Sequence, residues 1–443
     1  MTMQAHRKWG RLGAVLPVGM AMALLASGCG GSGKAAQDRQ EPSAADALPT
    51  EKRDPVTITV GINASQMTEQ EVRRFISEPV RKKYPYITVE PVSLVGQGQT
   101  LTDRAAAKMV PDIVANGVGN IVQEYVPLGL MYDMSGLIEK YGFAVNRIQP
   151  ILLDAIRIGS GIKETFGIPI WNQAFGLIYN KDLFDKFGAA YPNDGMTWEQ
   201  VRDLAIKLNR NENGVQYYGL FPDSVYRGAN QLGLRFIDWS TKKAVLETDE
   251  WKELFTYWYS LWSAPGYAPK GTNYTTLFNQ GRLAMTSGST STAQTLLEIP
   301  QLNWDVATYP VNPIAPGVGQ RVTDFDLFLA STSANKDAAF QVISVVLSDE
   351  VQLDISRNGR MSALNNPAVQ NEFGQAVPGF QAKHVVAFTK PKLAVMPEYR
   401  DIAPTNDANA AFNSVLYDGK DINTALREAN EAINKKIQAS LSK

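Results

Sequence analysis

Early in the predicted globule, the spacing of hydrophobic residues changes from the period of a strand to that of a helix. This change limits the folds that the chain can adopt. Residues 56–60 alternate between apolar and polar side chains, as a half-buried strand does, and a helical pattern with a capping box at Thr68 and Glu71 follows. Further strands are predicted over residues 86–92 and 111–117. Strands joined through a helix become parallel neighbours, and ligands bind beyond the carboxyl ends of such strands. The sequence therefore predicts an α/β fold.

Length and charge exclude several classes of function. The chain has 443 residues, enough for two large domains, and its formal net charge is −1. Because phosphate binding requires a basic field, we expect no nucleic acid as a partner. The predicted strand ends carry neither a G-x-G-x-x-G series nor a Walker lysine, so nucleotide phosphates have no cradle. A neutral, polar ligand fits better, and no cofactor is expected.

One cysteine and two histidines limit the chemistry further. Cys29 is the only thiol, which excludes an intrachain disulfide and cysteine-rich zinc sites. His6 lies in the first segment of the chain. The sequence has no G-x-S-x-G motif that would supply a nucleophilic serine for His384, so we interpret His384 as a structural or surface histidine. The sequence therefore predicts no catalytic residue and no metal site.

The first 28 residues are typical of an export signal. Three basic residues precede an apolar run over 12–26, which is shorter than the ~20 residues that cross a bilayer. Residues 24–29, Leu-Leu-Ala-Ser-Gly-Cys, resemble a bacterial lipobox, in which the cysteine becomes the lipid-modified N-terminus. We therefore predict a lipoprotein signal peptide over 1–28 and a lipid anchor on Cys29.

The stretch after the cysteine cannot form a core. Residues 30–55 contain no aromatic and no β-branched aliphatic side chain. We interpret residues 29–55 as a flexible linker that lets a globule, beginning at Val56, stand off the outer face of the cell membrane.

Four later segments resemble one family, in the family's order. They are residues 167–184 (GIPIWNQAFGLIYNKDLF), 197–200 (TWEQ), 277–285 (LFNQGRLAM) and 327–340, which ends in NKDAAF. These segments resemble the sugar-binding family of bacterial extracellular solute-binding proteins that feed ABC importers. With the lipobox, the resemblance spans about residues 1–29 and 56–443.

The resemblance implies a two-lobe, periplasmic-binding-protein-like α/β fold with an interlobe cleft. The chain would cross between the lobes near residues 171–174, 320–324 and 365. Lobe 1 would comprise residues 56–171 and 323–365, and lobe 2 residues 172–322 and 366–443. The implied function is that of a monomeric, lipid-anchored protein that captures a sugar or oligosaccharide and delivers it to the permease subunits of an ABC transporter.

Two alternatives remain open at this point. A surface enzyme acting on glycans would need two carboxylates about 5–9.5 Å apart, and the 44 acidic residues could supply them. A binding protein of the same fold could instead take a non-sugar solute, such as a peptide or a metal ion held by tyrosine and carboxylate ligands.

Candidate ligand-binding residues are aromatic rings, which stack on the C–H faces of sugars, and polar side chains that bind hydroxyls. Trp171, at the first crossing, would either stack on the ligand or pack in the hinge. In the resembling family, the segment that contains Tyr226 and Trp239 faces the cleft. The polar candidates are Asn63, Ser65, Asn116, Ser289 and Asp324, with Tyr399 and Arg400 as weaker additions.

The lipobox-like run generates a direct test of the anchor. Changing Cys29→Ala should release the protein into the medium, because the acylated residue is lost. Fractionation of cells followed by immunoblotting measures this. A variant that stays in the membrane fraction, with its leader removed, would contradict the anchor.

Overall fold

The computed structural model describes residues 54–64, 66–221, 223–400 and 402–442. Cys29, the predicted signal peptide, most of the linker and the candidate Ser65 lie outside the described residues. Residues 43–443 make up one unit, and the description below concerns that unit. Within the described ranges, no helix combines the length and the apolar character that crossing a membrane requires.

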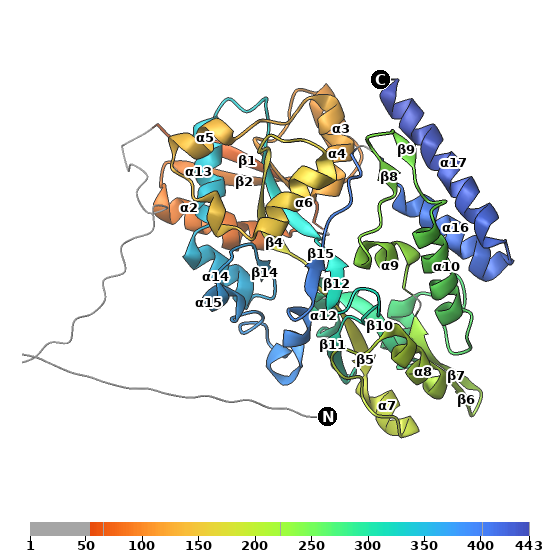
Figure 1. Cartoon of the computed structure of the whole chain (residues 1–443). Coiled ribbons are helices and arrows are strands. Elements are labelled where there is room, and N and C mark those ends of the chain that lie inside the picture. Colours follow the sequence, from red (N-terminus) through yellow and green to blue (C-terminus); the bar gives the residue numbers. More distant parts are fainter. Residues whose placement is uncertain (1–53, 65, 222, 401, 443) are drawn as a thin grey trace, which may run out of the picture. The chain divides into compact units, whose positions relative to one another are not determined.

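The first large sheet has six strands in the order β14-β4-β13-β3-β1-β2 (Figure 1). The central strand β1 runs parallel to both β2 and β3, which confirms the parallel arrangement predicted from the sequence. Strand β13 enters antiparallel between β3 and β4. The strands are β1 (Val56–Ile62), β2 (Ile87–Ser93), β3 (Ile113–Asn116), β4 (Gly167–Asn172), β13 (Asp324–Leu329) and β14 (Met361–Ser362).

Helices from residues 69–160 and 336–370 cover the six-stranded sheet. We call this sheet and these helices lobe 1. The capping box at Thr68 and Glu71 is present at the start of α1, and the helical segment that follows buries Phe75, Ile76 and Val80, as their spacing predicts. The helices are α1 (Glu69–Val72), a π-helical turn (Arg73–Ser77), α2 (Glu78–Lys83), α3 (Leu101–Ala106), α4 (Val118–Glu124), α5 (Ser135–Lys140), α6 (Pro150–Ser160), α13 (Lys336–Val346), α14 (Asp349–Arg357) and α15 (Pro367–Gln370).

The second large sheet has five strands in the order β11-β5-β10-β7-β6. Strand β10 runs parallel to β7 and antiparallel to β5, and β11 is antiparallel to β5. The strands are β5 (Phe175–Asn180), β6 (Arg210–Glu212), β7 (Val215–Phe221), β10 (Leu283–Ser289) and β11 (Trp304–Thr308).

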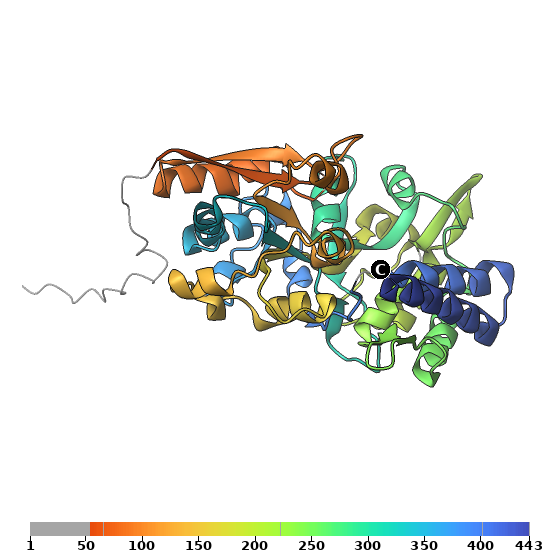
Figure 2. The ribbon, with the colours of Figure 1, turned by 90° about the horizontal axis from the view of Figure 1, so that it is seen from above.

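We call this sheet and the helices around it lobe 2. The final helix α17 buries Leu426, Ala429, Ile433 and Ile437 in one stripe, and it packs beside α16 and α10 (Figure 2). The other elements are α7 (Lys181–Phe187), α8 (Trp198–Leu208), α9 (Val225–Gln231), β8 (Ile237–Asp238), β9 (Lys243–Ala244), α10 (Asp249–Trp262), α11 (Tyr274–Asn279), α12 (Thr290–Leu296), β12 (Val318–Arg321), β15 (Lys392–Ala394), α16 (Thr405–Asp418) and α17 (Ile422–Leu441).

The chain passes between the sheets at two adjacent points. It leaves β4 for β5 through Gln173 and Ala174, and it returns from β12 to β13 through Val322 and Thr323. The backbone N–H of Gln173 donates to the carbonyl of Thr323 at 3.0 Å, and the N–H of Thr323 donates to Oδ1 of Asn172 at 2.8 Å. We call residues 172–175 and 321–324 the hinge, because these bonds join the two crossings.

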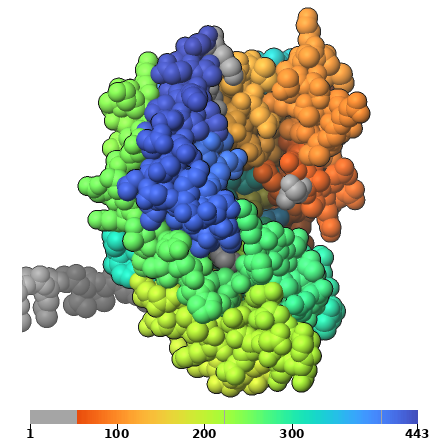
Figure 3. Space-filling view, turned by 90° about the vertical axis from the view of Figure 1, so that its right-hand side faces the viewer, coloured from red at the N-terminus to blue at the C-terminus, as the bar shows by residue number. Residues whose placement is uncertain are grey.

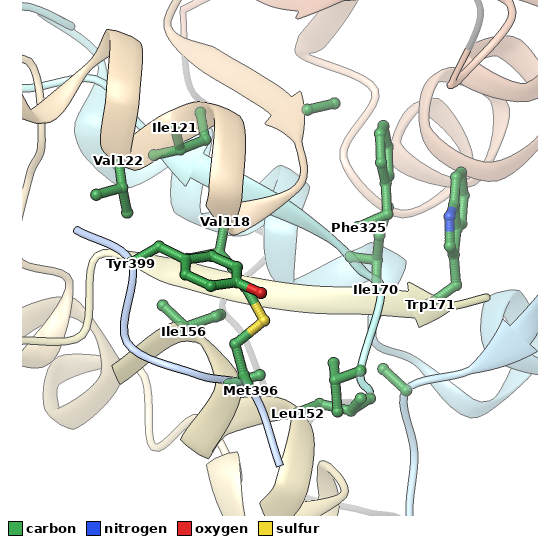
Figure 4. Close-up of a cluster of buried hydrophobic side chains, with 14 of the residues drawn as sticks. Val118, Ile121, Val122, Leu152, Ile156, Ile170, Trp171, Phe325, Met396 and Tyr399 are labelled. Atoms are coloured by element: carbon green, nitrogen blue, oxygen red, sulfur yellow. The ribbon is translucent and has the colours of Figure 1, made fainter. Parts of the chain in front are cut away.

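Trp171, at the end of β4, lies inside lobe 1. Its ring is fully buried and stacks on Phe325 with a centroid distance of 4.7 Å and an interplanar angle of 6° (Figure 4). The edge of Phe75 approaches at 6.2 Å, and the Arg360 guanidinium lies 5.2 Å from the ring centroid. Protein groups therefore occupy the surroundings of the ring. Of the two roles left open for Trp171, this packing favours hinge packing over stacking on a ligand.

This packing predicts a stability effect. Trp171→Ala should lower the free energy of unfolding by about 3–5 kcal/mol, because it removes a large, fully buried ring and leaves a cavity. Urea unfolding without ligand measures the change, with Trp239→Ala, which removes a partly exposed ring, as the control. A loss no larger than that of the control would show that Trp171 is not part of the core.

Candidate functional site

The six-stranded sheet brings polar side chains together at one edge. Asn116, at the end of β3, pairs with Asp326, while Asp324, at the start of β13, pairs with Asn172. Asn63 follows β1, which runs parallel to β3, so it lies at the same edge. Three of the predicted residues, Asn63, Asn116 and Asp324, therefore share the carboxyl edge of the lobe 1 sheet. That edge adjoins the hinge.

The sheet of lobe 2 has a matching edge. Ser289, the last residue of β10, pairs with Phe175, the first residue of β5, directly after the hinge. The Ser289 hydroxyl accepts the backbone N–H of Thr292 and caps helix α12. Ser289 thus lies at the edge of the lobe 2 sheet beside the hinge, where its side chain has a structural role as a helix cap.

Two buried carboxyl groups, Asp324 and Asp326, lie at the junction of the hinge and lobe 1. Burial raises the pKa of Asp324 to about 6, although Arg321 favours its charged form. Burial, followed by the charge of Asp324, raises the pKa of Asp326 well above its ordinary value. The backbone N–H of Val118, at the start of α4, also favours the ionised forms. Burial and the neighbouring carboxyl group therefore favour the protonated form of Asp326.

The two other predicted aromatic residues differ in their surroundings. Tyr226 is partly buried, and its hydroxyl accepts a hydrogen bond from Nε of Arg227 at 3.4 Å. The indole N–H of Trp239 donates to the carbonyl of Glu398 at 3.0 Å, and the Arg400 guanidinium lies 4.3 Å from the ring centroid. Trp239 is therefore in contact with the segment around Glu398. Tyr226 instead contacts Arg227, its neighbour on α9.

Residues 396–400 join the two lobes. Met396 and Tyr399 pack against α4 and α6 of lobe 1, among Val118, Ile121 and Ile156 (Figure 4). The Tyr399 hydroxyl donates to Oδ1 of Asn230 on α9 of lobe 2 at 3.2 Å. Tyr399, a weak candidate from the sequence, is thus a buried contact between the lobes.

Arg360 is a functional candidate that sequence reasoning missed. It precedes β14, and its Nη2 and Nε donate to Oε1 of Glu71 on α1 at 2.8 and 3.0 Å. Its Nη1 donates to the Ser291 hydroxyl on α12 at 2.8 Å. One side chain therefore binds lobe 1 and lobe 2 simultaneously. Because Glu71 lies 289 residues away along the chain, no local pattern could have indicated the contact.

A second missed group surrounds Arg227, on the first turn of α9. Its guanidinium lies 4.3 Å from the ring centroid of Phe175, which starts β5 beside the hinge. Asp223 lies four residues before it, just ahead of the N-cap of α9, and this acid–base spacing was the available signal. Arg227 thus belongs to the lobe 2 edge that carries Ser289.

The molecular surface is hollowed between parts of the two lobes (Figure 3). In Figure 3 the surface recedes where the orange and red residues of lobe 1 meet the green and blue residues of lobe 2. In the described part of the chain, no group of three or more histidine, cysteine or acidic side chains is arranged to hold a metal ion. Hydroxyl, amide, carboxyl and guanidinium groups are the chemistry that this region offers, and they suit hydrogen bonding to a polar solute.

Comparisons with known proteins agree with this architecture. The family model for bacterial extracellular solute-binding proteins matches residues 66–353. Relatives from Brucella abortus and Brucella suis, described as binding proteins, are 23% identical over 347 residues, which cover 70% of this chain and 80% of theirs.

Solved structures show the same fold. An ABC substrate-binding protein from Listeria monocytogenes, in complex with cycloalternan, has a TM-score of 0.70 at 21% identity and covers 87% of this chain and 100% of its own. A sugar transporter protein from Rhizobium etli has a TM-score of 0.68 at 21% identity, covering 85% and 99%. The sugar-binding protein MalE from Xanthomonas citri has a TM-score of 0.68 at 16% identity, covering 87% and 98%.

These matches confirm the two-lobe α/β fold that the sequence resemblance implied. They also remove the alternative of a glycan-acting enzyme, because the matching family is defined by solute binding. The chain belongs to the bacterial extracellular solute-binding protein family, and it is a binding protein rather than an enzyme.

Proposed function

We propose that this protein captures a sugar or oligosaccharide between its lobes, outside the cell, and delivers it to the permease of an ABC importer. The observation that carries the proposal is the meeting of two polar sheet edges at the hinge. Asn116 and Asp324 come from one edge, and Ser289 and Arg227 from the other. A solute bound by both edges would stabilise the closed arrangement of the lobes over the open one.

A carbohydrate is the ligand class that the chemistry favours. Sugars need hydroxyl partners together with flat apolar surfaces, and this region combines amides, carboxyls and hydroxyls with Tyr226 and Phe175. The Listeria and Xanthomonas structures, whose descriptions name cycloalternan and sugar binding, support the same class. The proposed contacts from lobe 1 are Asn63, Ser65, Asn116 and Asp324, and those from lobe 2 are Tyr226, Trp239 and Ser289.

The anchor and the lobe boundaries belong to the same proposal. Lipid on Cys29 and a flexible linker over 29–55 would keep the globule at the outer face of the membrane, near the permease. Residues 56–171 and 323–365, together with α15, would move as one body, and residues 172–322 with the rest of 366–443 would move as the other. A monomer suffices, because both edges of the site come from one chain.

A thermal-shift screen tests the proposed function. Mono-, di- and oligosaccharides are incubated with the purified globule, and amino acids, short peptides and divalent metal ions serve as control sets. A sugar at 100 times its dissociation constant should stabilise the protein by roughly 2.7 kcal/mol, which raises the unfolding temperature. Stabilisation by a peptide or a metal ion, with no response to any sugar, would contradict the proposed ligand class.

The raised pKa of Asp324 makes a second prediction. An ionised carboxylate accepts hydroxyl hydrogen bonds more strongly than a protonated one, so sugar affinity should rise as the pH increases through about 6. Calorimetric titration at several pH values measures this for the sugar found in the screen. In Asp324→Asn the rise should disappear, while the control Asp326→Asn should keep it. A rise that persists in Asp324→Asn would remove Asp324 from the site.

A further inference from the structure

Two contacts restrain the guanidinium group of Arg227 at the lobe 2 edge. Phe175 covers one face of its guanidinium at 4.3 Å, and Nε lies 3.5 Å from Oδ1 of Asp223. Only 22% of the arginine side chain is exposed, compared with 5% of Asp223. The planar group is therefore fixed by stacking and by a buried counter-charge, with a small part of it open to solvent.

The counter-charge is itself held in place. Oδ2 of Asp223 accepts the Tyr309 hydroxyl at 2.6 Å, and Oδ1 accepts the backbone N–H of Ser224 at 2.7 Å. Burial is the largest single influence and lowers the pKa of Arg227, but Asp223, Tyr226 and Tyr309 together raise the pKa overall. Arg227 is therefore permanently charged, and together with Asp223 it forms a neutral pair.

The donors of Arg227 are mostly unused. Nε donates to the Tyr226 hydroxyl at 3.4 Å, whereas neither terminal nitrogen has a hydrogen-bond partner among the described residues. A guanidinium offers these donors in a planar fork that fits two acceptors side by side. Such acceptors are the two oxygens of a carboxylate or the adjacent hydroxyls of a sugar ring.

The charge balance decides between these two partners. A carboxylate on the ligand would bring a second negative charge close to Asp223, whose charge already neutralises the arginine. A pair of sugar hydroxyls can accept the same two hydrogen bonds from the guanidinium and adds no charge. The neutral pair therefore favours an uncharged diol over an acid.

We propose that Arg227 determines ligand specificity, with its terminal N–H groups binding adjacent hydroxyls of a neutral sugar and Asp223 disfavouring acidic sugars. This inference rests on the proposed function and narrows its substrate class. Phe175 keeps the fork in one orientation, and Tyr226 lies beside it. The site would thus select for uncharged sugars by electrostatics as well as by shape.

The test uses matched neutral and acidic probes. Glucose, maltose and cellobiose are compared with glucuronate, maltobionate and cellobionate by calorimetric titration. The wild-type protein should bind the neutral member of a pair at least about tenfold more tightly. Arg227→Lys, which keeps the charge but loses the planar fork, should reduce the affinity for the neutral sugar by about tenfold or more. Thermal unfolding without ligand establishes that the variant is folded.

A second variant tests the role of the counter-charge. Asp223→Asn should increase the affinity for the acidic probe, because Arg227 is then no longer neutralised. Tyr309→Phe is the matched control, since it removes the hydrogen bond from the Tyr309 hydroxyl to Asp223 while Asp223 keeps its charge. The control should leave the preference for neutral probes unchanged.

The outcomes separate this inference from the proposed function. Equal affinity of wild type and Arg227→Lys for a neutral sugar would overturn the role of Arg227 while leaving sugar binding intact. Tighter binding of acidic probes by the wild type would overturn the role of Asp223. If neither these probes nor any sugar of the wider screen binds, the proposed function itself fails, and this inference with it.

Discussion

The structure depends on the hydrogen bonds that join the two adjacent crossings of the hinge. Thr323 donates to Asn172 and accepts from Gln173, so the outgoing and returning segments are tied side by side. The first crossing joins β4 and β5, one strand from each large sheet, and the second leads from β12 into β13 of the lobe 1 sheet. This short connection therefore fixes the position of one sheet edge relative to the other. Asp324 and Phe175, which begin the strands on either side, owe their places at the site to the same bonds.

A second constraint is electrostatic. The hinge buries Asp324 and Asp326 next to each other, and two ionised carboxylates there would repel in a medium that screens poorly. The raised pKa of Asp326 favours its protonated form, which lessens the repulsion. Near the other edge, Asp223 neutralises Arg227. Both edges thus carry polar groups while adding little net charge, which suits a protein that binds an uncharged solute.

Local patterns were enough to predict the parallel strands β1 to β3, the capping box at Thr68 and the strand ends that carry Asn63 and Asn116. Each depends on neighbours a few residues away. Trp171 shows where such reasoning stops: its sequence neighbours are those of a ligand contact, but its ring is enclosed by Phe325 and Phe75, which arrive from distant segments. The bridges made by Arg360 and Tyr399 are equally non-local, so neither was found as a contact between the lobes.

Arg360 has a mechanical consequence. Its guanidinium binds Glu71 and Ser291 while lying over Trp171, and the second oxygen of Glu71 accepts the backbone N–H of Thr68 at the start of α1. A rotation that separates α12 from α1 must therefore stretch or break a charge-assisted bond. Ser291 lies two residues beyond Ser289, so a single arginine links the lobe 2 edge to the exposed first turn of α1. Any relative motion of the two lobes at this point must involve the anchor of that turn.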